Sequence, residues 1–176
     1  VDKNFPIILL NTNFLFDQTL DYKNKLISLF KFENFLEVFP NNSDLEKFDP
    51  NNNLWKKDFE KCCYLRKVQP LDKVLKNYDA WISGRKSYQG GERRDLRPFE
   101  SNNGKIVVNP LANFGQKFVD EYFENHSLPK HPLLDEGFLS VGCTHCTHKS
   151  SNKNDPRSGR WLNQTKTECG IHYKKD

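Results

Sequence analysis

The spacing of the five cysteines constrains this 176-residue chain more than any other feature. Cys62 and Cys63 are adjacent, Cys143 and Cys146 are separated by two residues, and Cys169 stands near the end. An odd number argues against a closed disulfide framework, and a disulfide between neighbouring residues is strained. Two thiolates from one segment and two from a short loop can instead hold a four-coordinate inorganic centre. The pattern therefore predicts four metal ligands and one thiol, Cys169, that is left for reaction.

Composition narrows the class of protein. The mean hydropathy is -0.81 and 36% of the residues are apolar, which indicates a soluble protein with long polar loops. The sequence has no signal peptide and no membrane segment, so we expect a cytoplasmic protein. A net charge of +4 is too small to argue for nucleic acid. Basic residues cluster at Arg85/Lys86, Arg93/Arg94/Arg97 and Arg157/Arg160, which favours local anion binding over a general basic surface. For any one cluster, a solvated face is the alternative.

Apolar periodicity predicts strands alternating with helices, which indicates an α/β fold. We expect a strand buried on both faces at residues 5–10, an Asn/Asp-rich loop at 41–53, and mostly loop from 126 onward, ending in a mobile arm. Arg85 and Lys86 directly follow one expected strand, at the end where open parallel sheets bind ligands. Further strands are expected at 35–39, 80–83 and 105–109, and helices at 17–30, through Trp55, Phe59 and the Cys62–Cys63 pair, at 71–77 and at 115–124.

Six short motifs resemble one family. They are Cys-Cys-Tyr-Leu-Arg-Lys-Val-Gln-Pro-Leu (62–71), Ala-Trp-Ile-Ser-Gly-Arg-Lys (80–86), His-Pro-Leu (131–133), Gly-Cys-Thr-His-Cys-Thr (142–147), Asp-Pro-Arg-Ser-Gly-Arg-Trp (155–161) and Glu-Cys-Gly-Ile-His (168–172). In this order they resemble the assimilatory adenylyl-sulfate (APS) reductases, relatives of phosphoadenylyl-sulfate (PAPS) reductase. The resemblance covers nearly the whole chain.

The resemblance implies an adenine nucleotide α-hydrolase-like, Rossmann-like α/β fold, with a mostly parallel sheet flanked by helices. A partial PAPS/APS reductase domain would cover residues 1–149, and a flexible, loop-rich arm, residues 150–176, would carry Cys169. The implied activity is that of an oxidoreductase that reduces APS to sulfite and AMP with thioredoxin as electron donor. This reaction would serve sulfate assimilation and cysteine biosynthesis in the cytoplasm, with no membrane or nucleic-acid partner.

The same resemblance implies a catalytic role for Cys169. Its thiolate would attack the sulfate sulfur and form an S-sulfocysteine, from which a thioredoxin thiol would release sulfite. His172 and the neighbouring arginines are the expected source of positive charge beside this thiolate. Arg157 and Arg160 are expected to bind the phosphosulfate oxygens.

Two more basic residues are expected to contact the substrate. Lys67 lies four residues after Cys63, on the same helical face if the helix continues, so its ammonium would sit between the metal centre and the substrate. Arg85 is expected to contact the phosphate or sulfate of the nucleotide.

The four paired cysteines resemble the ligands of the family's 4Fe-4S cluster, whose implied role is to tune the site electrostatically. Cys62, Cys63, Cys143 and Cys146 would be its ligands. Structural zinc and buried unligated thiols are the alternatives, but a tandem pair is atypical of zinc sites. Family members with these cysteines generally use APS, so APS is the expected substrate.

The chain also departs from the family pattern. Residues 10–13 read Leu-Asn-Thr-Asn where the family has Leu-Asp-Thr-Gly. The family's phosphate-binding loop is absent before residue 5 and the chain has no methionine, so we expect an N-terminally incomplete chain whose activity requires the missing part. Most of the aromatic residues near its start are expected in the core, and some are expected to face the missing segment or a neighbouring subunit. A PAPS reductase, a non-catalytic metal-binding relative and a nucleotide-activating ATPase remain alternatives. The Cys169 motif argues against the last two.

Overall fold

The computed structural model describes residues 2–152, 154–162, 164 and 166–173. The chain divides into two compact units. Unit 1 comprises Val1–Val74 and Gly142–His145, and unit 2 comprises Leu75–Val141 and Cys146–Asp176. The predicted boundary between residues 149 and 150 follows another division of the chain and stays a prediction.

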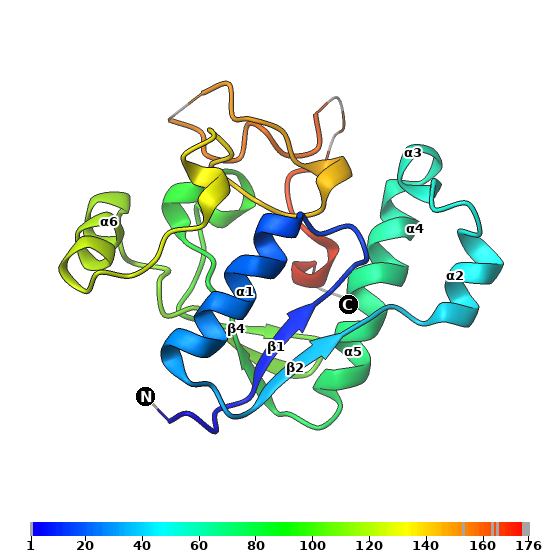
Figure 1. Cartoon of the computed structure of the whole chain (residues 1–176), viewed down its shortest axis with the longest axis horizontal. Coiled ribbons are helices and arrows are strands. Elements are labelled where there is room, and N and C mark those ends of the chain that lie inside the picture. The colour runs from blue at the N-terminus through cyan, green and yellow to red at the C-terminus, as the bar shows by residue number, and fades with distance from the viewer. Residues whose placement is uncertain (1, 153, 163, 165, 174–176) are drawn as a thin grey trace. The chain divides into compact units, whose positions relative to one another are not determined.

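Unit 1 begins with a strand–helix–strand segment. β1 (Ile7–Leu10) pairs in parallel with β2 (Phe35–Val38), and α1 (Asp17–Phe30) connects the two strands (Figure 1). The predicted helix at 17–30 is therefore confirmed. The prediction of a strand buried on both faces is wrong, because the side chains of β1 are only half-buried and β2 is its only neighbour in the described sheet.

A chain of short helices completes unit 1. The expected loop at 41–53 is wrong in part, because α2 (Asn42–Phe48) forms there, and the Asn41 side chain accepts a hydrogen bond from the Asp44 amide at its N-terminus. A π-helical turn, Tyr64–Val68, interrupts the helix that carries the cysteine pair. The helices that follow α2 are α3 (Leu54–Lys57), α4 (Phe59–Cys63) and, after the π-helical turn, α5 (Gln69–Leu75), whose last residue belongs to unit 2.

Unit 2 is built on a three-stranded sheet in the order β3-β5-β4. β3 (Ala80–Ile82) and β5 (Lys105–Val108) are parallel, as the two predicted strands required, and α6 (Gln116–Asn125) follows them. The sequence did not predict β4 (Phe99–Asn102), which pairs antiparallel to β5 through a tight turn. Two 3-10 turns, Ser87–Gln89 and Gly91–Arg93, follow β3 and reach the site described below.

The C-terminal part of the chain returns to unit 2. Thr147 and Arg160 form an isolated antiparallel bridge, and the His148 amide donates to the Gly159 carbonyl at 2.8 Å. A 3-10 turn, Gly170–His172, follows Cys169. Residues 153, 163, 165 and 174–176 of the predicted arm lie outside the described residues. Within the part of the chain that is described, we find no helix with the length and apolarity needed to cross a bilayer.

Candidate active site

Glu168, directly before Cys169, holds the cysteine segment of unit 2 in place. Its side chain is 3% exposed and pairs with the Arg93 Nε and, at 3.1 Å, with Arg157 Nη2. Arg93 Nη2 also donates to Glu168 Oε1 at 2.8 Å, and so does the Cys169 amide at 2.8 Å. Hydrogen bonds from Arg93 and the charges of both arginines outweigh burial and lower the pKa of Glu168 to about 2. The carboxylate is therefore ionised at neutral pH.

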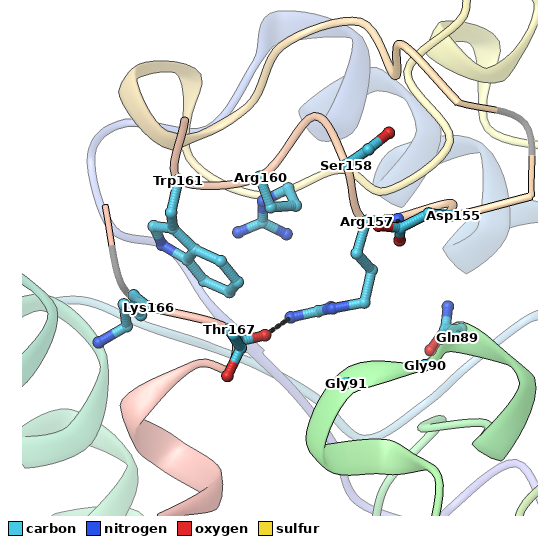
Figure 2. Close-up of a pocket in the computed structure, with 10 residues that line it drawn as sticks. All are labelled: Gln89, Gly90, Gly91, Asp155, Arg157, Ser158, Arg160, Trp161, Lys166 and Thr167. Carbon is cyan, nitrogen blue, oxygen red and sulfur yellow. Dashed lines mark hydrogen bonds between the residues drawn. The ribbon is translucent and has the colours of Figure 1, made fainter. Parts of the chain in front are cut away.

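Arg157 and Arg160 line a polar cavity of about 240 Å³ in unit 2 (Figure 2). This volume is smaller than the roughly 300–1,000 Å³ of pockets that enclose a whole drug-sized ligand, so the cavity suits one group of a larger ligand. Burial lowers the pKa of Arg157 to about 10, which leaves its guanidinium charged at neutral pH. Both guanidinium groups lie against the ring of Trp161, at 5.2 and 4.4 Å from its centroid. Lys166, which sequence reasoning missed, is also buried here.

His172 lies at the end of the same segment, stacked on Trp81 of β3 with 5.4 Å between ring centroids. Burial, together with the charges of Arg85, Arg93 and Arg157, lowers the pKa of His172 to about 3, against the opposing effect of Glu168. The imidazole is neutral at pH 7. His172 therefore carries no positive charge at neutral pH, and the role of the arginines beside Cys169 stays a prediction.

Arg85 is placed by a network at the ends of β3 and β5. Its Nη2 forms an ion pair with Glu100 and donates to Asn109 Oδ1 at 3.2 Å, while Asn109 Nδ2 donates to Glu100 at 2.8 Å. Asn109 is fully buried. Among the described residues, the buried Arg85 Nε and His172 Nδ1 have no hydrogen-bond partner. Because a buried N–H without an acceptor is costly, these atoms mark a place where a ligand oxygen could accept.

The paired cysteines occupy two segments. Cys62 and Cys63 are buried on α4 and Cys143 is buried in the returning loop, all in unit 1, whereas Cys146 belongs to unit 2. Cys143 Sγ lies 3.2 Å from Thr12 Oγ1. In the described part of the chain all five cysteines are present as thiols, and no group of three potential ligands surrounds one point. The donor chemistry, three buried thiols and the half-buried Cys146 without disulfides, fits a thiolate-ligated centre.

Arg66 is a residue whose role sequence reasoning missed. Its side chain is 1% exposed, forms an ion pair with Asp49 at 2.6 Å, and donates to Asn52 and to the Thr12 carbonyl at 2.8 and 3.0 Å. The guanidinium also lies 3.9 Å from the ring centroid of Phe14. Arg66 thus fixes the loop after β1, whose Phe14 carbonyl accepts from the amide that follows Cys143.

Lys67 follows on the π-helical turn. The helix continues past Cys63, as the prediction for Lys67 required, and Lys67 is buried in unit 1. Cys169 and the arginines that line the cavity belong to unit 2. The proposed contact between Lys67 and the substrate stays a prediction.

The two departures at residues 11 and 13 have local explanations. Asn11 Nδ2 donates to Glu37 Oε1 at 2.6 Å, and Lys23 pairs with the other oxygen of Glu37 at 2.8 Å. A carboxylate at position 11 would repel Glu37, whereas the amide donates to it. Asn13 has a φ of 62°, a left-handed conformation that asparagine tolerates better than most residues.

Comparison with known proteins places these features in one family. The model of the phosphoadenosine phosphosulfate reductase domain matches residues 1–149. The chain is 38% identical over 172 residues to the adenosine 5'-phosphosulfate reductase of Mesorhizobium japonicum, covering 98% of this chain and 68% of the relative. It belongs to the phosphoadenosine phosphosulfate reductase family. A relative with the same name from Chelativorans sp. is also 38% identical, with 98% of this chain and 70% of the relative covered.

Solved structures confirm the expected fold of this reductase family. The phosphate complex of PAPS reductase from Candida auris superposes with a TM-score of 0.68 at 25% identity, over 82% of this chain and 71% of that chain. FMN adenylyltransferase from Candida glabrata gives a TM-score of 0.61 at 13% identity over 84% of this chain and 46% of that chain, a likeness of fold alone. The expected adenine nucleotide α-hydrolase-like α/β fold is thus confirmed.

Proposed function

We propose that this protein reduces APS to sulfite and AMP with thioredoxin as electron donor, in the cytoplasm and as part of sulfate assimilation and cysteine biosynthesis. The observation that carries the proposal is the position of Cys169. Its backbone amide and the Arg157 guanidinium donate to the same oxygen, Glu168 Oε1. The chain that holds this arrangement belongs to the reductase family. The relatives named adenosine 5'-phosphosulfate reductase support APS as the substrate.

The first step is a transfer of the sulfonate group to Cys169. The Cys169 thiolate attacks the sulfate sulfur, a sulfur–sulfur bond forms, and the bond between that sulfur and the bridging oxygen breaks, so AMP leaves with the electron pair. An anionic nucleophile and an anionic substrate repel each other. Arg157 and Arg160 offset this repulsion, and the cavity that they line suits the sulfate or phosphate group.

The second step regenerates the thiol. One thioredoxin thiolate attacks Cys169 Sγ, Cys169 keeps its sulfur in a mixed disulfide, and sulfite leaves with the bonding pair. The second thioredoxin thiol then attacks the thioredoxin sulfur of the mixed disulfide. This forms the disulfide within thioredoxin and releases Cys169 as a thiolate. Two thiols are oxidised to a disulfide and the substrate sulfur gains two electrons.

We assign Arg85 and His172 to binding. The Arg85 Nε and His172 Nδ1 atoms, which are buried and without a partner among the described residues, would donate to substrate oxygens. The neutral imidazole of His172 can donate from one nitrogen only, so the tautomer with a proton on Nδ1 is the one that binds an oxygen. Lys67 would add a cation to the same substrate.

We propose that Cys62, Cys63, Cys143 and Cys146 hold a 4Fe-4S cluster. The burial of three of these thiols and the absence of disulfides among the described residues support this assignment. When bound, the cluster supplies a fixed local charge near its ligands, while the electrons of the reaction come from thiols. Structural zinc is the alternative metal for the same four thiols.

A PAPS reductase is the second candidate. The family model and the Candida auris structure carry that substrate in their names, which favours testing it. The two substrates differ by a 3'-phosphate on the ribose, so a protein that prefers PAPS needs an additional cation for that group. Assay of both nucleotides distinguishes the two reductases.

Sulfite release from APS and from PAPS with reduced thioredoxin tests the proposal, on anaerobically purified protein. We expect turnover of APS and its loss in Cys169→Ser. Without thioredoxin, mass spectrometry of the Cys169 peptide should show one added SO₃ group after incubation with APS. Turnover of PAPS alone would establish the second candidate, and no sulfonated Cys169 with either nucleotide would refute a reductase function.

A further inference from the structure

The Glu168 carboxylate connects Cys169, the proposed nucleophile, to Arg157, the guanidinium that lines the cavity. One oxygen, Glu168 Oε1, accepts from Arg157 Nη2 at 3.1 Å, from Arg93 Nη2 at 2.8 Å and from the Cys169 amide at 2.8 Å. Arg157 Nη2 also donates to the Thr167 carbonyl at 2.9 Å. The Cys169 backbone and the Arg157 guanidinium are therefore fixed to the same atom.

This arrangement leaves one edge of Arg157 toward the cavity. Figure 2 shows the side chain crossing from its own segment toward Thr167, with the guanidinium along the cavity. Among the described residues, its protein hydrogen bonds use Nη2 only, so Nη1 and Nε remain for an oxyanion. A guanidinium that rotated about its long side chain would lose this orientation.

We propose that Glu168 is a positioning residue, which sets the Arg157 guanidinium and the Cys169 thiol at a fixed separation for attack on an oxyanion-bearing sulfur. This inference rests on the proposed function and deepens it. In this role Glu168 acts through Arg157 and not on the substrate itself. Arg93, from the turn Gly91–Arg93, holds both oxygens of the carboxylate.

Net charge alone predicts the opposite behaviour. Glu168 places a negative charge beside a nucleophile that must be anionic and a substrate that is anionic. If only the electrostatic field mattered, removal of this charge would speed the attack on any anionic reagent. If Glu168 positions Arg157, its removal slows that attack although the field becomes more favourable.

A second contact anchors the same segment and provides a control. The Thr167 hydroxyl donates to Glu92 Oε1 at 2.6 Å. Thr167 directly precedes Glu168, and Glu92 directly precedes Arg93. Glu92 is exposed, and within the described residues no hydrogen bond or ion pair joins it to Arg157 or Cys169. Glu92→Gln therefore removes a carboxylate that anchors the segment, but not the one that positions Arg157.

The test compares alkylation of Cys169 by iodoacetate, which is anionic, with alkylation by neutral iodoacetamide. Rates are read on the Cys169 peptide by mass spectrometry, so the other cysteines do not interfere. In Glu168→Gln, which keeps size and an acceptor oxygen, we expect the ratio of the iodoacetate rate to the iodoacetamide rate to fall about fivefold. Glu168→Asp, which keeps the charge but is one methylene shorter, should lower the ratio too, and Glu92→Gln should leave it unchanged.

Sulfonation of Cys169 by APS provides the second readout. In a single turnover without thioredoxin, Glu168→Gln should be roughly 10- to 100-fold slower than the unsubstituted protein, as expected for a misplaced cation. If the unsubstituted protein forms no S-sulfonate, the proposed function fails while the alkylation ratio still decides the role of Glu168. A ratio of the iodoacetate to the iodoacetamide rate that rises in Glu168→Gln would overturn the positioning role. So would a ratio that falls equally in Glu92→Gln. If Glu168→Gln does not fold, the same comparison is made with Glu168→Asp.

Discussion

At the scale of single residues, the stability of unit 1 depends on the buried ion pair between Arg66 and Asp49. Both side chains are buried, and removing one partner leaves the other as an uncompensated charge. We expect Arg66→Met to lower the free energy of unfolding by about 3–5 kcal/mol. Chemical denaturation measures this loss. Lys117→Met, which breaks the exposed pair with Glu121, should cost less than about 0.5 kcal/mol, and equal losses would contradict the assignment.

His172 gives the pH dependence of the site. Its pKa of about 3 in the folded protein lies below the ordinary value of 6.5, so folding favours the neutral form. The stability that this adds is complete above pH 6.5 and is lost as the pH falls from 6.5 toward 3. We expect the His172 imidazole signals in NMR spectra, assigned with His172→Gln, to stay constant from pH 8 to about 5. A midpoint near 6.5 would show that the imidazole is exposed to water.

Single residues also show what the sequence could not predict. Cys169 and the arginine clusters stand out by residue type and spacing, and the resemblance to a family supplied their expected roles. Asp49, the ion-pair partner of Arg66, lies 17 residues away in the chain, and Arg93 lies 75 residues from Glu168. A charged residue in a sequence is read as exposed unless its partner is known, and spacing along the chain does not reveal that partner.

At the scale of elements, Gly159, beside the isolated Thr147–Arg160 bridge, cannot be replaced by a residue with a side chain unless the backbone shifts. A Cβ there would lie 2.2 Å from the His148 carbonyl oxygen, and the His148 amide is itself bonded to the Gly159 carbonyl. We expect Gly159→Ala to displace the neighbouring Arg157 and Arg160 and to lower turnover about 100-fold. Gly115→Ala, where no atom lies within 4 Å, should keep turnover within about twofold. Steady-state assays compare the two, and normal turnover in Gly159→Ala would show that the bridge can shift.

Elements were predicted well where the apolar pattern was long and poorly where polar chemistry decided. The helix at 17–30 agrees with α1 because its apolar residues repeat over several turns. α2 was missed because its sequence, Asn-Ser-Asp-Leu-Glu-Lys-Phe, has the composition of a loop, and the Asn41 cap starts it. β4 was missed because Phe-Glu-Ser-Asn is stabilised by pairing with β5, which no local pattern reports.

At the scale of the whole molecule, the alternation of strands and helices was enough to predict the α/β class. It did not predict two separate sheets, because the local pattern of a strand carries no information about which strand it joins. The ten residues around the cavity come from segments near 90 and near 160. The resemblance to a family pointed to Arg157 and Arg160, but nothing in the sequence indicated that residues 89–91 line the same cavity.

Metal binding extends this argument to segments 62–63 and 143–146. If the four thiols hold a 4Fe-4S cluster, binding adds to the stability of the segments that carry them, because the unfolded chain offers no preformed site. We expect Cys62→Ser to lose the visible iron–sulfur absorption and more than about 90% of its iron, and to exchange amide hydrogen faster in α4 and in residues 142–146. Cys169→Ser should keep both the iron and the slow exchange. Zinc in place of iron in metal analysis would reject the cluster. Unchanged metal content and amide hydrogen exchange in Cys62→Ser would reject it too, since a thiol outside the metal centre can be replaced without affecting either segment.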